Sequence, residues 1–451
     1  MTVVTNHLVA LLGFAGVLVL LLFLIAKWKW HVFLAMLVPI LIFGIIPGIQ
    51  KGNFIAAFES GFGKTLGKIG VVIVLGSIIA EALKHTGAIQ VITRSMVKAV
   101  GSTRMPLALT LTGFVLGIAI FSDVAYVILN PLVHASAHAM KVSIGVTSIG
   151  LVGALQLTHA IVPPTPGPLA AAALLGADIA KTIFFGGIAC LVGSLASWIW
   201  GQFVAGPIIK TLPSPEFAAE SLSSVDSESP QPTVMGAYAP IVVPILLISL
   251  PSVIGFMLPE ENALRELINY LGWPVVALTI GVWLAFQNIK DPNQKKEAKD
   301  RWVKDGLRVS AMILVVTGLG GSLSAILKGT PAVDTVSKLF VTMELPAILL
   351  PFVIGIIGNM ITGSTTVGVI TAASLVAPML DSLGLSPEAA MLAAGSGSVM
   401  IKYVNSSYFW VCTSLSKLSL KEALLGYGGV TFVGGAASFA AVYVMWIAGV
   451  V

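Results

Sequence analysis

The sequence has very little charge for its length. Only 10% of its 451 residues are Asp, Glu, Lys or Arg, whereas 57% are hydrophobic. A soluble domain typically carries about 25% charged residues, so a soluble fold of this size could not cover its own surface. These proportions exclude a soluble enzyme, a nucleic-acid binder and a disordered scaffold. They predict an all-α polytopic membrane protein.

Cysteine is also scarce. Cys190 and Cys412 lie in apolar segments and can build neither a disulfide framework nor a metal quartet. His134 and His138 have the i, i+4 spacing of two metal ligands, but no adjacent Glu or obvious third ligand accompanies them. We therefore expect no metal and no cofactor, and polar packing for the two histidines.

Apolar segments that could cross a bilayer, which takes about 20 residues, recur along the chain. We interpret the first as a retained helix, because no basic region precedes it and no small-residue cleavage site follows it. Several others are short and interrupted by Gly, Pro, Ser and Thr, which is typical of broken helices and re-entrant hairpins. The candidates are Leu8–Ala26, Val32–Ile46, Ile69–Leu83, Leu107–Ile120, Ile144–Val162, Ile183–Val204, Ala239–Leu258, Ile268–Ala285, Val309–Leu327, Ala347–Ile361, Met391–Ile401 and Ala423–Val450.

Two polar segments organise the chain. Residues 211–235 are rich in Ser, Pro and Glu and are predicted to be a flexible cytoplasmic linker between membrane repeats 1–210 and 236–451. Lys290–Arg308 is the densest basic cluster, and the positive-inside rule places it in the cytoplasm. Lys27 and Lys29 place the first loop there too. Both termini are then expected outside.

An internal repeat supports this division. Phe114-Val-Leu-Gly-Ile118 resembles Phe352-Val-Ile-Gly-Ile356, and weaker matches keep the same order at shifts of 238–244 residues. The charge bias suggests that the two halves are inverted relative to each other. Inverted repeats with broken helices are typical of a secondary transporter whose site lies near the bilayer midplane. A channel is the alternative, because channels also contain such repeats.

Two interruptions in the first half carry polar chemistry. Asp123 lies between apolar runs, where an ionised carboxylate costs at least a few kcal/mol. It serves function, or Ser122 or Asp123 caps the following helix, and the two roles are compatible. His159-Ala-Ile-Val-Pro-Pro-Thr-Pro-Gly-Pro168 cannot continue a helix and is predicted to be a hairpin tip. The N-terminus of the helix after it is a potential anion site.

Two interruptions in the second half occupy the matching repeat positions. Gly358-Asn-Met-Ile-Thr-Gly-Ser-Thr-Thr366 is a cluster of glycines and hydroxyls that precedes a helix from Val367. Gly395-Ser-Gly-Ser398, followed by Asn405-Ser-Ser407, is predicted to be the second hairpin. Lys402 is a lone cation there, and it either reaches an interface or pairs with a substrate carboxylate.

At these interruptions the chain resembles the gluconate permease family of proton symporters, within the ion-transporter superfamily. The resemblance rests on Gly63-Lys-Thr-Leu-Gly67, Asp123-Val, Leu129-Asn-Pro-Leu132, Val162-Pro-Pro-Thr-Pro-Gly-Pro-Leu-Ala170, Gly363-Ser-Thr-Thr-Val367, Val404-Asn405 and Phe409-Trp410. It implies proton-driven transport of gluconate or a related hydroxy acid, an inner-membrane location, paired hairpins, an elevator-type transport domain and a homodimer. Where the family commonly has Ser-His-Val-Asn-Asp, this chain has Lys402-Tyr-Val-Asn-Ser406.

These features predict a proton-coupled symporter that brings a small hydroxycarboxylate into the cytoplasm. Asp123 and His159 are the candidates for proton coupling. A sodium-coupled carrier is the alternative within transport, and an intramembrane enzyme is the alternative from another class. The expected partners are the small carboxylate substrate, protons or sodium, the lipid bilayer and a second copy of the chain, and no nucleic acid. The predicted substrate-binding residues are Ser122, Asp123, Thr158, Pro164, Thr165, Gly167, Gly363, Ser364, Thr365, Thr366, Ser396, Ser398, Asn405 and Ser406.

Overall fold

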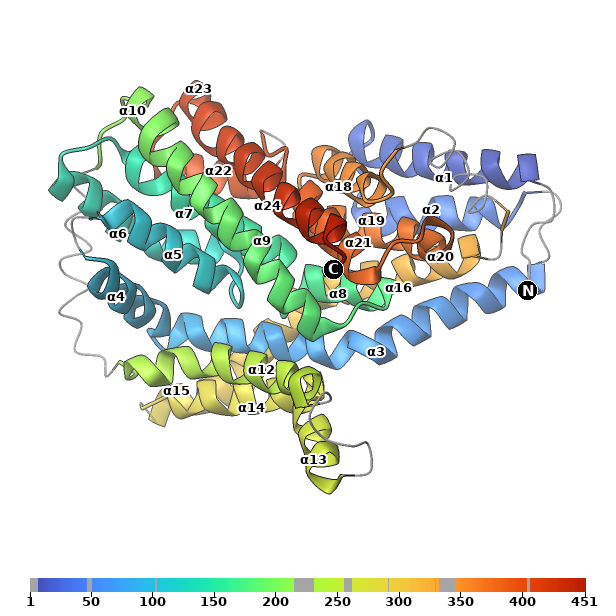
Figure 1. The fold of residues 1–451 in the computed structure, drawn as a ribbon, viewed down its shortest axis with the longest axis horizontal. Helices are drawn as coiled ribbons and strands as arrows, with labels where there is room; N and C mark the ends of the chain where they lie inside the picture. The colour runs from blue at the N-terminus through green and yellow to red at the C-terminus, as the bar shows by residue number, and fades with distance from the viewer. Residues whose placement is uncertain are drawn as a thin grey trace.

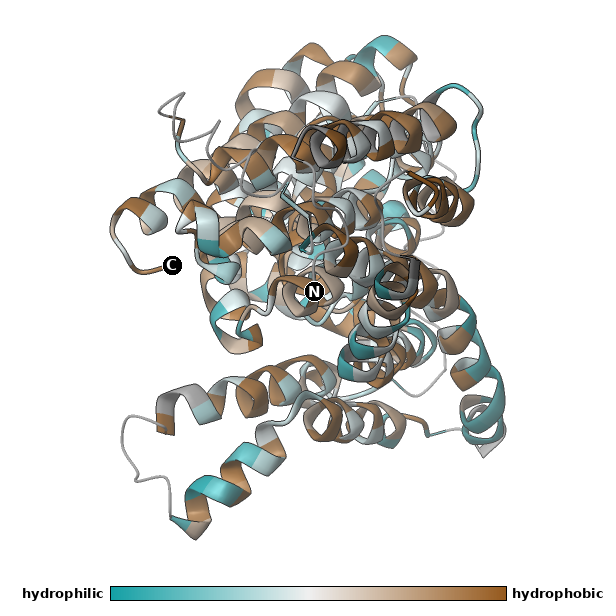
Figure 2. Ribbon diagram, turned by 90° about the vertical axis from the view of Figure 1, so that its right-hand side faces the viewer, coloured by the Kyte–Doolittle hydropathy of each residue, from teal (hydrophilic) through white to brown (hydrophobic). Residues whose placement is uncertain are grey.

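The computed structural model describes residues 7–46, 51–101, 104–214, 231–254, 262–290, 292–328, 330–331, 345–403 and 406–451. All regular elements within these ranges are helices (Figure 1). Six of the described helical segments are long and apolar enough to cross a membrane, and the number rises to eight if each of two bent pairs counts as one span. Figure 2 shows hydrophobic residues along most helices and a more hydrophilic helix, α13, at the bottom of the view. The all-helical membrane class predicted from the sequence is confirmed.

The first half of the chain contains the helices that surround the first two interruptions. They are α1 (His7–Ala26), α2 (Val32–Phe43), α3 (Lys51–His85), α4 (Ala88–Val100), α5 (Met105–Gly117), α6 (Ser122–Met140), α7 (Ile144–Ile161), α8 (Pro166–Leu175), α9 (Ile179–Ile199), the π-helical η2 (Trp200–Ala205) and α10 (Gly206–Ile208). Every residue of α7 is buried, so this helix lies at the centre of the molecule.

The second half begins after the predicted linker, of which residues 215–230 lie outside the described part. Its elements are α12 (Val234–Ile254), α13 (Ala263–Gly272), α14 (Pro274–Gln287), α15 (Pro292–Glu297), η4 (Ala298–Trp302), α16 (Val303–Lys328), α18 (Leu349–Thr362), α19 (Thr365–Val376), η5 (Ala377–Met379), α20 (Leu380–Leu383), α21 (Pro387–Val399), α22 (Ser407–Leu415), α23 (Leu420–Ala423), η6 (Leu424–Gly428) and α24 (Gly429–Ile447).

The helices form two groups. Helices α3, α12 and α14 pack together along the lower side of Figure 1. Above them, α7 packs against α5 and α9, and α24 packs against both α9 and α21. Helix α8, which belongs to the upper group, contacts α3 of the lower group. The proline-rich interruption before α8 therefore lies close to the boundary between the two groups.

Helix α3 is longer than the sequence predicts. The apolar run suggests a span over Ile69–Leu83, but the helix begins at Lys51. Glu59, Lys64 and Lys68 interrupt the apolar pattern, although long charged side chains are good helix formers. Apolar periodicity marks where a helix contacts lipid or core, and it misses the charged extension.

The order of helices repeats along the chain. Five consecutive helices of the first half begin 241 to 244 residues before five helices of the second half. The paired starts are Met105 and Leu349, Ser122 and Thr365, Ile144 and Pro387, Pro166 and Ser407, and Ile179 and Leu420. This offset agrees with the shift that the sequence motifs give, and it supports an internal repeat.

The hairpin lies elsewhere than predicted. Helices α7 and α8 together form one apolar segment, Ile144–Leu175, which unwinds at residues 162–165. By contrast, α18 and α19 fold back on each other. Their close approach is shown at Gly358, where an added Cβ would lie 3.0 Å from the Cα atom of Gly368. Prolines interrupt the hydrogen-bond ladder of α7, but proline in the first turn restarts a helix in α8, so no reversal is required. The proline segment is therefore an unwound break, and the hairpin tip is at Gly363-Ser364.

The two helices of the second predicted hairpin, α21 and α22, also do not pack against each other as a hairpin. Helix α21 ends at Val399 and packs on α18 and α19, whereas α22 begins at Ser407 and packs on α6. The predicted interruption begins later than expected, because Gly395-Ser-Gly-Ser398 is part of α21, which continues to Val399. The helix then ends, the described residues 400–403 and 406 lie outside regular helix, and α21 and α22 have different neighbours. The described residues at 162–165 likewise form a break between successive helices.

A carboxylate joins the end of the first half to the second half. Glu422, in α23, accepts hydrogen bonds from the backbone N–H groups of Lys210 and Thr211, at 3.0 and 3.2 Å, and from the Thr211 hydroxyl at 2.9 Å. It also accepts from the Ser419 backbone and hydroxyl, which completes a capping box. The start of the predicted linker is therefore fixed to the C-terminal half.

We expect Glu422→Ala to destabilise the folded protein by about 2 kcal/mol, because hydrogen bonds to a charged group are worth about 1.5–3 kcal/mol each and this site is partly exposed. Thermal unfolding of the purified protein in detergent measures the change as a lower Tm. Glu266→Ala is the matched control, since Glu266 is exposed on α13. Equal Tm values for the two variants would contradict a stabilising role for the hydrogen bonds of Glu422.

Candidate functional site

At the break between α7 and α8, one hydroxyl group hydrogen-bonds to backbone carbonyl groups that lack helical partners. Thr165 lies just before α8, and its Oγ1 is 2.7 Å from the Val162 carbonyl oxygen and 3.0 Å from the His159 carbonyl oxygen. These carbonyls have lost their helical partners because the prolines that follow carry no N–H. The Pro163–Pro164 peptide bond is cis. Thr165 therefore satisfies backbone groups that the break exposes.

The hairpin tip lies beside this break. Gly363 ends α18 with φ of 72°, and Ser364 caps α19 by accepting a hydrogen bond from the Val367 N–H at 3.4 Å. Only glycine adopts this backbone conformation without strain, which explains its place at the tip. Gln156 of α7 donates from Nε2 to the Thr365 Oγ1 at 3.0 Å. A side-chain hydrogen bond thus joins the broken helix to the hairpin.

Two helix N-termini meet at this point. A Cβ built at Gly167, in the first turn of α8, would lie 3.2 Å from the Cα atom of Thr366, in the first turn of α19. The N–H groups of Gly167, Thr365 and Thr366 are in first turns and have no helical carbonyl to donate to. Each N-terminus also carries about half a positive charge from the helix dipole. The arrangement is suited to binding an anion.

Asp123 lies in a different environment from the one that the sequence predicts. Its side chain is exposed rather than buried, and its Oδ1 accepts from the Val124 N–H at 2.9 Å. The N-cap of α6 is Phe121, without a side-chain cap, so neither Asp123 nor Ser122 plays the predicted capping role. The helix begins one residue earlier than a cap at Ser122 requires. Asp123 nevertheless interacts electrostatically with His159 and Lys402, which places it near the break.

Lys402 belongs to the second break and points at the hairpin tip. Its Nζ donates to the Gly363 carbonyl oxygen at 3.1 Å and to the Ser406 Oγ at 3.3 Å, and the residue is 5% exposed. A buried lysine excludes the predicted alternative in which the side chain reaches an interface. Asn405, the other predicted polar residue here, lies outside the described residues.

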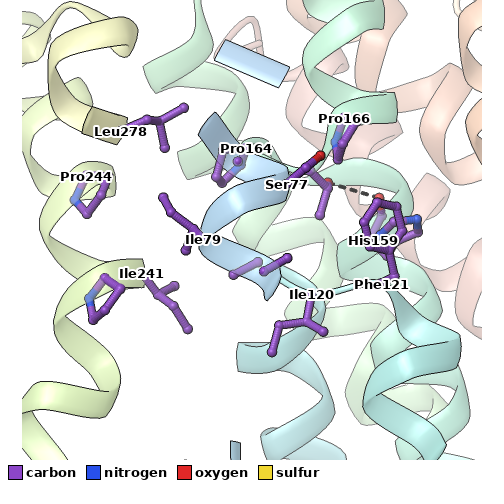
Figure 3. Close-up of a pocket in the computed structure, with 15 residues that line it drawn as sticks. Ser77, Ile79, Ile120, Phe121, His159, Pro164, Pro166, Ile241, Pro244 and Leu278 are labelled. Atoms are coloured by element: carbon purple, nitrogen blue, oxygen red, sulfur yellow. Dashed lines mark hydrogen bonds between the residues drawn. The ribbon is translucent and has the colours of Figure 1, made fainter. Parts of the chain in front are cut away.

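His159 lines a narrow cavity between the break and the lower group of helices. The cavity is bounded by Ser77 of α3, by Pro164 and Thr165, and by Pro240 and Pro244 of α12 (Figure 3). It has room for about one water molecule. Among the described residues, neither Nδ1 of His159 nor the Ser77 hydroxyl has a hydrogen-bond partner, although both are buried. The ring of Phe121 lies 5.3 Å from the imidazole, centroid to centroid.

Three of the hydroxyl groups predicted to bind substrate donate hydrogen bonds to carbonyl groups of their own helices. Thr158 donates to the Ala154 carbonyl at 3.0 Å, Ser396 to the Leu392 carbonyl at 2.8 Å, and Ser398 to the Gly395 carbonyl at 2.8 Å. Ser and Thr commonly bond back in this way in membrane helices. These residues are buried packing groups of α7 and α21, and the structure does not bring them to the hairpin tip.

His134, the first of the paired histidines, has a structural role. His134 accepts a hydrogen bond from the Ser214 N–H at Nδ1, at 2.9 Å, and its Nε2 lies 3.0 Å from the Leu415 carbonyl oxygen. Both ring nitrogens are therefore engaged by the backbone. No cluster of three or more potential metal ligands occurs within the described ranges.

Two residues of this region, Gln156 and Ser77, are not among the predicted site residues. Gln156 is the one amide side chain of α7, and Ser77 is a single hydroxyl in the apolar part of α3. A buried amide is costly unless it is paired, so Gln156 could have been found as an isolated polar residue at apolar depth. Ser77 gives no such signal, because serine is common in membrane helices.

The sequence model described as GntP family permease matches residues 8–451. The gluconate permease of Pseudomonas aeruginosa is 30% identical over 407 residues, covering 89% of this chain and 90% of that protein. The D-serine transporter DsdX of Escherichia coli K12 is 30% identical over 431 residues, covering 95% of this chain and 96% of that protein.

The fold also matches a solved transporter structure. The YdaH transporter of Alcanivorax borkumensis superposes with a TM-score of 0.64 over 98% of this chain and 99% of that one, at 13% identity. At this level of identity, the likeness concerns the fold alone.

Proposed function

The chain belongs to the GntP family of permeases and is an integral inner-membrane transporter rather than an enzyme, and on that premise we propose that it is a proton-coupled importer of a small hydroxycarboxylate. The relatives named for gluconate, L-idonate and D-serine all carry a small molecule with a carboxylate and at least one hydroxyl. The proposal takes this shared chemistry as the substrate class.

One observation carries the proposal: the N-termini of α8 and α19 meet in backbone contact at Gly167 and Thr366. A carboxylate at this point accepts from first-turn N–H groups and is stabilised by two helix dipoles. The side chains of Thr365 and Thr366 lie on the same turn and supply hydroxyls to the polar end of the substrate. Transporters typically bind anionic groups at such half-helix N-termini.

The packing of the two halves supports an inverted repeat and an elevator-type movement as part of the proposal. Helix α8 of the first half packs on α19 of the second, and α22 of the second packs on α6 of the first. This exchange of equivalent contacts is what a pseudo-twofold axis through the site produces. The proposed functional unit is a homodimer with both chain termini outside.

The coupling proton is assigned to His159, with Asp123 as the second candidate. His159 is buried beside the break, it lines the narrow cavity together with Ser77, and its Nδ1 has no hydrogen-bond partner among the described residues. Histidine is the side chain whose charge changes most readily near neutral pH. Asp123 is exposed and is not among the residues that line this cavity. The alternative of sodium coupling would instead use unwound carbonyls at the breaks.

Uptake by the wild-type protein in proteoliposomes tests the proposal. Gluconate, L-idonate and D-serine are offered with an imposed pH gradient, acidic outside, and separately with a sodium gradient at fixed pH and membrane potential. We expect concentrative uptake of at least one hydroxycarboxylate that depends on the pH gradient and collapses with a protonophore. Accumulation driven by sodium alone, or mere equilibration, would assign sodium coupling or a channel instead.

A further inference from the structure

Lys402 is a buried cation in contact with the hairpin tip. It follows α21, is 5% exposed, and donates to the Gly363 carbonyl at 3.1 Å and to the Ser406 hydroxyl at 3.3 Å. Burying an ammonium is costly unless it is paired or well hydrogen-bonded. A lysine at this depth therefore needs a function that offsets this cost.

The position of the ammonium is informative. The Gly363 carbonyl is at the C-terminal end of half-helix α18, where the helix dipole places partial negative charge. In transporters with broken helices, half-helix C-terminal ends and unwound carbonyls are the groups that coordinate a mobile coupling cation. Here a covalently attached cation already contacts such a carbonyl.

The ammonium has no carboxylate partner of its own in the described part of the chain. Its two acceptors, a carbonyl and a hydroxyl, are both neutral, and no described Asp or Glu forms an ion pair with it. Asp123 acts on it only electrostatically, from beyond ion-pair distance. A lysine ammonium has three donors, so one remains for a further acceptor.

We propose that Lys402 is the fixed counter-ion of the substrate carboxylate and occupies the place of a mobile coupling cation at the hairpin tip. The proposal rests on the proposed transport of a small hydroxycarboxylate and goes further, because it assigns the two ends of the substrate. The carboxylate lies toward Lys402 and the helix N-termini of α8 and α19. Asp123, whose Oδ1 accepts from the Val124 N–H, is assigned to the hydroxyl end of the substrate.

The test compares Lys402→Gln, Lys402→Arg and the wild type in proteoliposomes with the N-methylglucamine salt of gluconate. Lys402→Gln keeps an N–H for the Gly363 carbonyl but loses the charge. We expect it to raise the KM for gluconate at least about tenfold, the loss expected for one charged hydrogen bond. Lys402→Arg keeps the charge and is expected to stay within about threefold of the wild type. Lys421→Gln, on the exposed surface of α23, is the matched control.

Sodium supplies a second readout that a purely structural role would not change. Wild-type uptake is expected to be independent of sodium at fixed pH and potential. In Lys402→Gln, added sodium is expected to recover at least about threefold of the lost affinity, since a mobile cation can enter the vacated position. A sodium requirement in the wild type, or an unchanged KM in Lys402→Gln, overturns the proposal.

A binding measurement separates this proposal from the proposed function. Gluconate is expected to raise the Tm of the purified wild-type protein in detergent, and the shift is expected to disappear in Lys402→Gln but not in Lys421→Gln. If no wild-type uptake occurs but this pattern of Tm shifts holds, the transport proposal fails and the counter-ion assignment stands. If gluconate shifts the wild type and Lys402→Gln equally, or shifts neither, the counter-ion assignment fails. A Lys402→Gln variant that does not fold is replaced by Lys402→Met under the same criteria.

Discussion

Gly167→Val is expected to lower substrate uptake at least about a hundredfold while the protein still folds. The ideal Cβ position at Gly167 is 3.2 Å from both the Cα atom and the Oγ1 atom of Thr366, closer than most real contacts. Valine therefore either separates the first turns of α8 and α19 or fills the space between them. A favourably placed helix dipole is worth up to about 2 kcal/mol to an anion, so weakening two of them corresponds to about two orders of magnitude in affinity.

The matched control is Gly187→Val in α9, where a Cβ would meet nothing within 4 Å. Uptake and gluconate-dependent Tm shifts are measured for both variants, and Gly167→Ala is expected to fall between Gly167→Val and the wild type. Gly167→Val with wild-type uptake and a normal Tm shift would show that the anion does not bind between these two helix ends.

The sequence predicts the interruptions well because their chemistry is local. Prolines at 163, 164, 166 and 168 and the Gly363-Ser364 pair end or restart helices through their own backbone properties, and the helix bounds agree. Whether the chain reverses at an interruption is not local. The reversal at Gly363 depends on close backbone packing between Gly358 and Gly368, and no such packing joins α7 to α8.

The candidate site was predictable in composition but not in detail. Thr165, Gly167, Gly363, Ser364, Thr365 and Thr366 do gather around the break and the tip, because repeat-related segments meet there. The environment of Asp123 was not predictable, since its exposure depends on how α6 packs rather than on its apolar neighbours in sequence. The hydrogen-bond partners of Thr158, Ser396 and Ser398 depend on the side-chain rotamer, which the sequence does not specify. In sequence, a hydroxyl that bonds to its own helix cannot be distinguished from one that binds a ligand.

The contact of Lys402 with Gly363 joins residues 39 positions apart in the chain. From sequence alone, a lysine near the end of an apolar helix more often extends toward the membrane surface. Burial selects between the two possibilities here, and burial depends on the packing of α21 against α18 and α19. Lys402, where the resemblance implies a different residue, therefore lies beside the hairpin tip of the candidate site.

His159→Gln is expected to abolish accumulation driven by a pH gradient while leaving substrate exchange. For one proton carried with one monovalent anion, a gradient of one pH unit, worth about 1.4 kcal/mol, supports at most about a tenfold concentration ratio. Glutamine keeps a polar side chain beside Phe121 and the cavity but cannot carry a proton across. The accumulation ratio of the variant should therefore fall to about one, whereas exchange of labelled for unlabelled substrate needs no net proton movement and continues.

Asp123→Asn and Ser77→Ala decide between the groups near this cavity. Because Asp123 is exposed and is not among the residues that line the cavity, Asp123→Asn is expected to keep the pH-driven accumulation ratio, with a higher KM if Asp123 binds substrate hydroxyls. Ser77→Ala is expected to slow uptake without changing the final accumulation ratio of the substrate. A group on the proton path affects the rate of proton transfer, whereas the accumulation ratio depends on the group that couples proton and substrate movement. Full accumulation by His159→Gln together with its loss in Asp123→Asn would transfer the coupling role to the carboxylate at the start of α6.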